Sequence, residues 1–369
     1  MNKPIEDQML YVSFNQDSSC FVIGTQRGFK IYSSYPLKNS YERILDGGIG
    51  IVEMLYKSNI IALVGGGHSP KYNKNKVIIW DDYQNKIISE LKFSSSVLNV
   101  KLKRDKIFVV CNRRIFIFNF QNFRNLDIID TLNNPNGLFG LNQSEKQTII
   151  AFPVSIEKEN IQGYIKIKNY NKEKELLIHV QDNTISYISI NNDGTMLASS
   201  SDEGTNIRIH RISDGLFLQE FKRGIENIEI NYICFDNYSN FLATTCDRGI
   251  IHIWSLENCI KKMKEVEEIK NNDNVDNNEN TVNNQNINND LSQNKFSFFQ
   301  NFFGFKGEYS FAQIRLEDEQ KCICTFDKDN NIIVIGSNGK YYHAVLDSKK
   351  GGNCVIDYSY ILIEKKEEN

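Results

Sequence analysis

Short apolar runs separated by polar turns recur along most of this chain, and four of the repeats share one spacing. Each unit reads as a strand, a polar turn, a second strand, a glycine turn and a third strand in which apolar and polar residues alternate. An apolar residue stands ten positions after the start of each unit, and a glycine stands seventeen positions after it. The starts are Tyr11, Tyr187, Tyr232 and Cys322; the apolar residues are Phe21, Leu197, Leu242 and Ile332; the glycines are Gly28, Gly204, Gly249 and Gly339.

The length of the repeat predicts a β-propeller. The step from Tyr187 to Tyr232 is 45 residues, which lies within the range of four-stranded propeller blades. Weaker units occupy residues 51–81 and 97–118, and the first of them ends in the Trp80-Asp81 dipeptide that is typical of WD40 blades. A pair of β-sandwiches is the alternative, but a sandwich offers no reason for a fixed glycine spacing.

One segment interrupts the repeats. Residues 271–294 contain 12 asparagines in 24 positions and show no periodicity, so they cannot bury enough apolar surface to offset the entropy lost on ordering. We predict a long inserted loop over residues 261–305, disordered for much of its length. The remaining 324 residues, at roughly 46 residues per blade, amount to seven blades. The expected fold is therefore all-β: a seven-bladed WD40-like propeller over residues 1–363 with this one insertion.

Composition excludes several classes of function. The 43 Lys and Arg nearly balance the 46 Asp and Glu, which argues against wholesale nucleic-acid binding. The eight cysteines form no Cys-x-x-Cys pair and favour buried, reduced thiols in the cytoplasm, without a structural metal or cofactor. The N-terminus does not read as a signal peptide, and no apolar run is long enough to span a bilayer. The five histidines form no catalytic motif, and Gly65-Gly66-Gly67 lacks the Lys of a phosphate-binding loop, so we expect no enzyme.

Two adjacent cations mark the end of one predicted strand, in the sequence Phe221-Lys222-Arg223-Gly224. Neighbouring side chains of a strand point to opposite faces, so Lys222 and Arg223 cannot serve one pocket equally. Each cation could instead serve its own anion pocket, one on either side of the strand. The simpler alternative is a solvated basic strand end.

Together these segments resemble the PROPPIN family, the WIPI-type phosphoinositide-binding β-propellers of autophagy, and are most similar to its shorter WIPI3/WIPI4-like branch. The resemblance covers nearly the whole chain and rests on LYVSFNQDSSCFVIGTQRGF, GGIGIVEMLYKSNIIALVGGG, PKYNKNKVIIWDD, LASSSDEGTNIRI, FKRG, RGIIHIW, FAQIRL and GGNCVIDY. It implies a monomeric peripheral membrane protein that binds phosphatidylinositol 3-phosphate and 3,5-bisphosphate. Such a protein would recruit autophagy machinery to phagophore, endosomal or vacuolar membranes from the cytoplasm. The asparagine-rich insertion suggests a genome with that bias, as in protists, where plastid membranes are an alternative.

The resemblance also implies two lipid sites on the rim, one on each side of FKRG. The first site would use Ser199, Ser201, Gly204, Thr205, Arg208 and Lys222, with His179 at its border. The second would use Arg223, Gly224, Thr244, Thr245 and His252. Lys222 replaces a family arginine and cannot bind phosphate through two parallel bonds. Cys246 and Ile250 stand where the family has hydroxyl side chains, which leaves the second site open to question, while His252 predicts tighter binding in mild acid.

Two further contacts are expected. The segment 295–307 holds Phe298, Phe299, Phe302 and Phe303 at helical spacing, and we predict that these side chains insert into the membrane, the alternative being that they fold back onto the propeller. The resemblance implies a protein partner, the large autophagic lipid-transfer protein, on the early blades; the loop 65–76 with Lys71, Lys74 and Lys76 is the candidate surface, or else simply a solvated basic loop. A WD40-like scaffold that binds proteins but no lipid is the alternative function.

Overall fold

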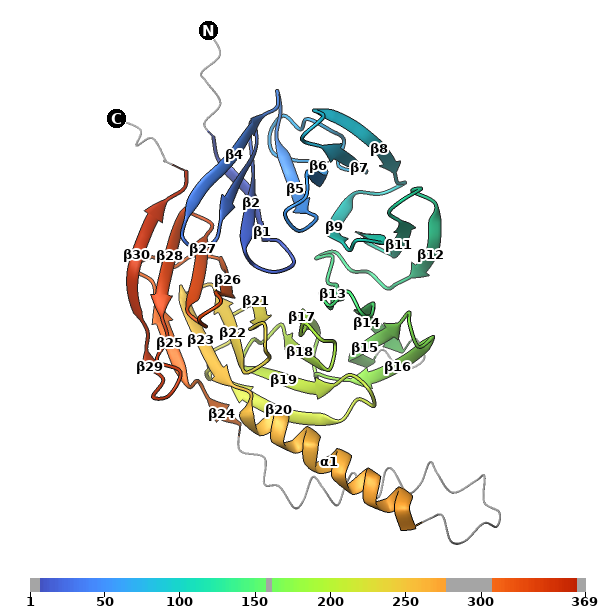
Figure 1. Ribbon diagram of the computed structural model, residues 1–369, viewed down its shortest axis with the longest axis vertical. Helices are drawn as coiled ribbons and strands as arrows, with labels where there is room; N and C mark the ends of the chain where they lie inside the picture. Colours follow the sequence, from blue (N-terminus) through green and yellow to red (C-terminus); the bar gives the residue numbers. More distant parts are fainter. Residues whose placement is uncertain (1–6, 157–160, 277–306, 364–369) are drawn as a thin grey trace.

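Seven antiparallel sheets follow one another around a ring in the computed structural model, which describes residues 7–156, 161–276 and 307–363 (Figure 1). Each sheet is one blade, numbered here in chain order, and its first strand lies nearest the ring centre. Blades 1 to 3 contain β1 (Met9–Phe14), β2 (Cys20–Thr25), β3 (Gly28–Ser33) and β4 (Lys38–Ile44); β5 (Ile49–Met54), β6 (Ile60–Gly65), β7 (Lys76–Asp81) and β8 (Lys86–Lys92); and β9 (Val97–Leu102), β10 (Lys106–Cys111), β11 (Arg114–Asn119) and β12 (Asn125–Asp130).

Blades 5 and 6 each gain a fifth strand along their outer edge. Blade 4 contains β13 (Gly140–Leu141), β14 (Ile149–Ile156), β15 (Ile161–Asn169) and β16 (Lys174–His179), and blade 5 contains β17 (Ile185–Ile190), β18 (Met196–Ser201), β19 (Asn206–Arg211) and β20 (Phe217–Lys222), with β24 (Glu308–Tyr309) parallel to β20. Blade 6 contains β21 (Ile230–Phe235), β22 (Phe241–Cys246), β23 (Ile250–Ser255) and β25 (Ala312–Arg315), with β29 (Gly352–Asn353) parallel to β25; blade 7 contains β26 (Cys322–Phe326), β27 (Ile332–Gly336), β28 (Lys340–Val345) and β30 (Val355–Ile361).

The four repeats identified in the sequence are confirmed as the first three strands of blades 1, 5, 6 and 7, and the weaker units at 51–81 and 97–118 form blades 2 and 3. The shared glycine stands in the turn before the third strand in blades 5, 6 and 7, and it begins the third strand in blade 1. Gly204 and Gly249 both have positive φ, 60° and 64°. A Cβ on Gly204 would lie 1.9 Å from the carbonyl oxygen of Ile228, so only glycine fits this turn.

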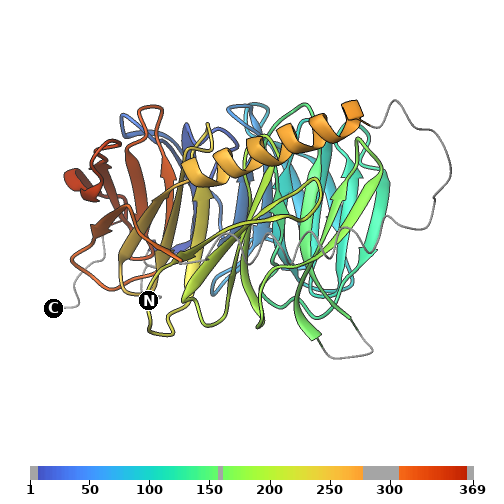
Figure 2. The ribbon, with the colours of Figure 1, turned by 90° about the horizontal axis from the view of Figure 1, so that it is seen from below.

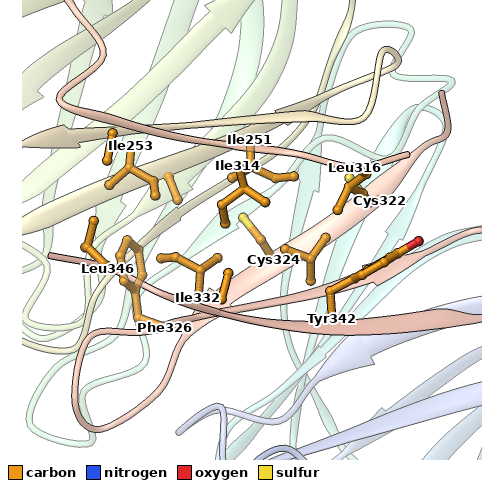
Figure 3. Close-up of a cluster of buried hydrophobic side chains, with 14 of the residues drawn as sticks. Ile251, Ile253, Ile314, Leu316, Cys322, Cys324, Phe326, Ile332, Tyr342 and Leu346 are labelled. Carbon is orange, nitrogen blue, oxygen red and sulfur yellow. The ribbon is translucent and has the colours of Figure 1, made fainter. Parts of the chain in front are cut away.

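Apolar side chains between neighbouring blades form the core. Between blades 6 and 7, Ile251 and Ile314 pack against Cys324 and Ile332, all at most 1% exposed (Figure 3). The eight cysteines are free thiols, six of them buried and two partly buried, and all except Cys246 contribute to these apolar contacts.

The ring closes through side chains, because every strand of blade 7 comes from the C-terminal part of the chain and every strand of blade 1 from the N-terminal part. Phe21 is fully buried and stacks on Tyr32 at 5.1 Å and on Tyr341 at 6.1 Å between ring centroids. The Tyr341 hydroxyl donates a 2.6 Å hydrogen bond to the Ser34 carbonyl of blade 1. Apolar packing and this buried bond therefore join the two ends of the chain.

The insertion within blade 6 differs in part from the expected disordered loop. Helix α1 (Glu257–Asp276) includes residues 261–276 and runs along the outside of β20 (Figures 1 and 2). Cys259 is fully buried against blade 5, Met263 packs beside it, and the Lys262 ammonium donates to the carbonyls of Phe217 and Leu218 at 2.9 and 3.3 Å. These tertiary contacts stabilise a helix that the polar composition of the segment does not predict. Residues 277–305 of the predicted loop lie outside the described residues.

The closure of the ring can be tested at Tyr341. We expect Tyr341→Phe to lower the free energy of unfolding by about 1–3 kcal/mol, because the Ser34 carbonyl would be left buried without its donor. Urea unfolding of the full chain measures this difference. Tyr83→Phe is the matched control, since Tyr83 is 88% exposed; equal stability of both variants would contradict the role given to the Tyr341 hydroxyl.

Candidate functional site

The motif FKRG lies at the end of β20, the fourth strand of blade 5, between the seams that this blade makes with blades 4 and 6. Phe221 is fully buried and stacks on Trp254 of blade 6, with ring centroids 5.5 Å apart. Lys222 points to the opposite face of the strand, toward blade 4, and its aliphatic chain packs against Gly307. Arg223 continues the ladder, since its amide donates to the Thr205 carbonyl at 2.8 Å, and its side chain returns to the blade 6 side. The two cations thus face different inter-blade seams. The outer part of each seam is called here the 4/5 groove, which includes Arg208 and Lys222, and the 5/6 groove, which includes Arg223 and His252.

In the 4/5 groove, the Arg208 guanidinium donates hydrogen bonds to two carboxylates. Its Nε donates to Glu220 at 2.9 Å, across the β19–β20 pair, and its Nη2 donates to Asp182 at 2.6 Å, from the blade 4 side. The Arg208 guanidinium holds the pKa of Asp182 below its ordinary value through this hydrogen bond. Lys222 lies two residues beyond Glu220 on the same face and makes no ion pair with any residue in the described ranges.

The small side chains predicted for the first site line the same face but are largely enclosed. Ser199 pairs with Arg208 across β18 and β19, and both its hydroxyl and its carbonyl accept hydrogen bonds from the Gln181 amide at 3.1 and 2.8 Å. Ser199 is fully buried and Ser201 is 7% exposed. Gly204 and Thr205 form the turn that leads into β19. The site residues are brought together here, with Arg208 and Lys222 as its partly exposed cations.

Arg223 is held in the 5/6 groove by neutral acceptors. Its Nε donates to the Gly204 carbonyl at 2.8 Å, and its Nη2 donates to the Glu226 carbonyl. Burial lowers the pKa of this guanidinium, which nevertheless stays charged, since an arginine titrates far above neutral pH. Because carbonyl oxygens orient the guanidinium without cancelling its charge, Arg223 retains a net positive field in the groove.

His252 lies in the same groove, on β23. It is 8% exposed, stacks on Trp254 at 5.6 Å, and its Nδ1 lies 3.3 Å from the Ser310 hydroxyl. Burial, and then the charges of Arg223 and Arg315, lower its pKa to about 4. The imidazole is therefore neutral at mildly acidic pH until an anion binds beside it.

The two threonines predicted for the second site face in different directions. Thr244 pairs with His252 across β22 and β23 and shares its groove. Thr245 does not: it is fully buried on the blade 7 side, where its hydroxyl donates to the Cys322 carbonyl at 2.6 Å. The prediction for Thr245 is corrected because adjacent strand residues alternate between faces. Cys246 does face the 5/6 groove, and its thiol donates to the Ile250 carbonyl at 3.4 Å.

Several groove residues were missed by the sequence analysis. Arg315 belongs to β25, two residues from Gln313, which pairs with His252, so it lies on the face of this histidine. Arg248 contacts the Glu226 carboxylate at 2.6 Å. The alternation of β20 would have revealed Glu220, but no sequence spacing connects Arg315 or Asp182 with the motif. Two exposed apolar side chains also flank the motif: Ile225, 92% exposed, directly follows it, and Tyr309, 72% exposed, pairs with Lys222.

The structure describes two of the three other predicted contacts. His179 ends β16 as an exposed side chain that packs against Tyr164, with ring centroids 4.8 Å apart. In the loop 65–76, Lys71 and Lys74 are exposed, whereas Lys76 forms an ion pair with Glu90. The predicted membrane-inserting residues, Phe298, Phe299, Phe302 and Phe303, lie outside the described residues.

Within the described ranges, no group of three or more His, Cys, Asp or Glu side chains could hold a metal ion. No helix in that part of the chain has the length and apolar character needed to span a membrane.

The chain is similar in sequence to known proteins. The chain is 30% identical to Autophagy-related protein 18e of Arabidopsis thaliana over 357 residues, which cover 96% of this chain and 88% of that protein. It is 35% identical to SVP1-like protein 2 of Saccharomyces cerevisiae over 290 residues, 69% of this chain and 64% of that one.

Among solved structures, Hsv2 of Kluyveromyces lactis superposes with a TM-score of 0.72 at 20% identity, covering 97% of this chain and all of that one. Atg21, in a complex with a coiled-coil of Atg16, superposes with a TM-score of 0.73 at 22% identity, covering 96% and 99%. The profile of one family, PROPPIN, matches residues 9–363, nearly the whole described propeller. This chain belongs to the PROPPIN family of autophagy-related β-propellers.

Proposed function

We propose that this protein binds phosphatidylinositol 3-phosphate and 3,5-bisphosphate headgroups in the two grooves beside FKRG, and thereby recruits autophagy machinery to membranes from the cytoplasm. Phagophore, endosomal, vacuolar or plastid membranes would carry these lipids. The PROPPIN family is not an enzyme family, which agrees with a role in recruitment.

The observation that carries the proposal is the separation of the two cations at one point of the rim. Lys222 and Arg208 face one groove, and Arg223 and Arg315 face the next. Two headgroups bound on either side of one strand would tether the same edge of the propeller to one bilayer. Two weak contacts of this kind combine into a useful membrane affinity, because the second forms at a high effective concentration.

Apolar side chains support an approach of this rim to the bilayer. Ile225 and Tyr309 are largely exposed and flank the basic motif, as expected of residues that enter the interfacial region beside a headgroup. We also propose, from its sequence, that the segment with Phe298, Phe299, Phe302 and Phe303 inserts into the same membrane.

A protein-binding scaffold is the second candidate function. A neighbouring structure, that of Atg21, is a complex with a coiled-coil of Atg16, so a propeller of this shape can bind a protein partner. We propose that the early blades of this chain bind the autophagic lipid-transfer protein, with exposed Lys71 and Lys74 as candidate contacts. Lipid and protein binding are compatible, because they would use separate parts of the ring.

Lys222→Ala tests the lipid proposal without disturbing the fold. We expect binding to vesicles that contain phosphatidylinositol 3-phosphate to weaken about tenfold, since one charge-assisted contact is lost, while thermal stability is unchanged. Lys86→Ala, an exposed lysine at the start of β8, is the control and should bind like the parent. If the parent does not bind these vesicles, or if Lys222→Ala binds as well as the parent, lipid recognition by this motif is rejected and the scaffold function is favoured.

Arg223 is a less clean position for that test. Arg223→Thr would leave the Gly204 and Glu226 carbonyls without their donor, so the double replacement of Lys222 and Arg223 by threonine should lower stability as well as lipid binding.

Ile225→Asp tests the membrane contact separately from headgroup recognition. We expect vesicle binding to weaken far more than binding of soluble inositol phosphates, because a carboxylate is disfavoured in the interfacial region, whereas its repulsion of a soluble headgroup is screened by solvent. Co-sedimentation and calorimetry measure the two quantities, and Tyr238→Asp, 74% exposed in the β21–β22 turn, is the control. Deletion of residues 296–305 should act in the same direction. Equal vesicle affinity of Ile225→Asp and the parent would remove Ile225 from the membrane contact.

His252 predicts a pH dependence. Its pKa is about 4 in the free protein, and a bound phosphate favours the imidazolium, so binding takes up a proton and gains strength as the pH falls. The phosphate itself loses charge near its second pKa of about 6, which weakens all binding equally. We therefore expect the ratio of parent affinity to His252→Ala affinity to increase between neutral and mildly acidic pH in vesicle co-sedimentation. A constant ratio would show that His252 does not contact the anion.

A further inference from the structure

In the 4/5 groove, the positive charges are balanced by carboxylates of the same groove. Arg208 bonds to two carboxylates, Glu220 at 2.9 Å and Asp182 at 2.6 Å. Lys222 adds one positive charge without an ion pair to a described residue. With two cations and two carboxylates, the groove carries no net charge. An anion that binds Arg208 must therefore compete with Asp182, whose side chain is 69% exposed and free to turn into solvent.

The 5/6 groove has the opposite balance. Arg223, Arg248 and Arg315 supply three positive charges, and Glu226, which bonds to Arg248 at 2.6 Å, is the carboxylate paired with them. Arg223 donates its hydrogen bonds to neutral carbonyls. Arg315 is exposed and has no ion pair in the described part of the chain. Both side chains lie on the groove side, because Arg223 returns toward blade 6 and Arg315 shares the face of His252, whose pKa both charges lower. Glu308 adds a second carboxylate to this seam, since it pairs with Phe221 across β20 and β24 and accepts a hydrogen bond from Asn258. Three cations therefore exceed two carboxylates, and the net charge of this groove is positive.

We propose that this difference in charge divides the two lipids between the grooves: the 5/6 groove takes the bisphosphate, with Arg315 contacting its second phosphate, and the 4/5 groove takes the monophosphate, with Asp182 setting a limit on the charge it accepts. This inference rests on the proposed binding of 3-phosphorylated inositol headgroups. A second phosphate adds roughly two negative charges, which gain attraction beside unpaired arginines but meet repulsion beside Asp182 and Glu220. The loss of hydroxyls at Cys246 and Ile250 thus does not make the 5/6 groove the weaker site.

Free inositol phosphates present the same chemistry as lipid headgroups. Two kinds of probe separate the sources: phosphatidylcholine vesicles that carry one or the other phosphoinositide, and the soluble headgroups inositol 1,3-bisphosphate and inositol 1,3,5-trisphosphate. Binding of vesicles identifies the lipid as the ligand. Binding of soluble headgroups alone would reject the proposed lipid function, while the variants below would still report how the grooves divide the two charges.

The decisive variants are Arg315→Gln and Asp182→Asn in the full chain, each measured with both kinds of vesicle and both soluble headgroups. We expect Arg315→Gln to weaken binding of the bisphosphate lipid about tenfold and of the monophosphate lipid less than about twofold, because it removes one charge-assisted contact from one groove. Asp182→Asn should strengthen monophosphate binding about threefold and reduce its preference over the bisphosphate. Arg114→Gln is the control, since Arg114 is an exposed arginine paired with Asp130 on blade 3.

The outcomes separate the two proposals. If the parent binds both lipids but Arg315→Gln weakens them equally or not at all, the division by charge is overturned and lipid binding stands. If Asp182→Asn leaves monophosphate binding unchanged, the role given to Asp182 is overturned. Loss of all binding by the parent overturns both proposals. Thermal unfolding of each variant excludes misfolding, and both substituted side chains are exposed.

Discussion

The burial of Phe221 is the constraint on which the arrangement of the basic motif depends. Its ring is fully enclosed between blades 5 and 6 and stacks on Trp254. Alternation along β20 then directs Lys222 toward blade 4 and Arg223 toward blade 6. A shift of the strand by one residue would exchange the two cations, but it would also expose Phe221, at a cost of the order of 3 kcal/mol. The apolar contact therefore holds two charged side chains in two separate grooves.

The partners of the arginines decide what each groove offers an anion. Arg208 and Arg223 lie on the same blade, yet Arg208 bonds to carboxylates and Arg223 bonds to backbone carbonyls. A carboxylate orients a guanidinium and cancels its charge, whereas a carbonyl orients it and leaves the charge available. Because Arg223 donates to these backbone carbonyls, it also stabilises the blade. Removing Arg223 would therefore lower the stability of the blade as well as the charge of the groove.

A ring of blades is suited to such sites. A seam between blades brings together side chains from separate parts of the chain, as Asp182 of the 4/5 connection meets Arg208 of β19. Within blade 6, the strand that follows the insertion places Arg315 on the face of His252. Because the ring closes through buried aromatic packing and the Tyr341 hydrogen bond, the seams keep a constant geometry without exchange of strands between the termini.

The sequence by itself determined the repeat, the number of blades, the glycine turns at Gly204 and Gly249, and the separation of Lys222 from Arg223, because all of these follow from local periodicity and backbone sterics. Alternation along the strand also predicts that Thr245 points away from Thr244, although the family resemblance had placed both side chains in one site. Only the tertiary structure decided that α1 is helical, since its stability comes from Cys259 and Lys262 packing on blade 5. It alone also decided the charge of each groove, because that charge depends on residues brought together across seams, and no spacing along the chain encodes such contacts.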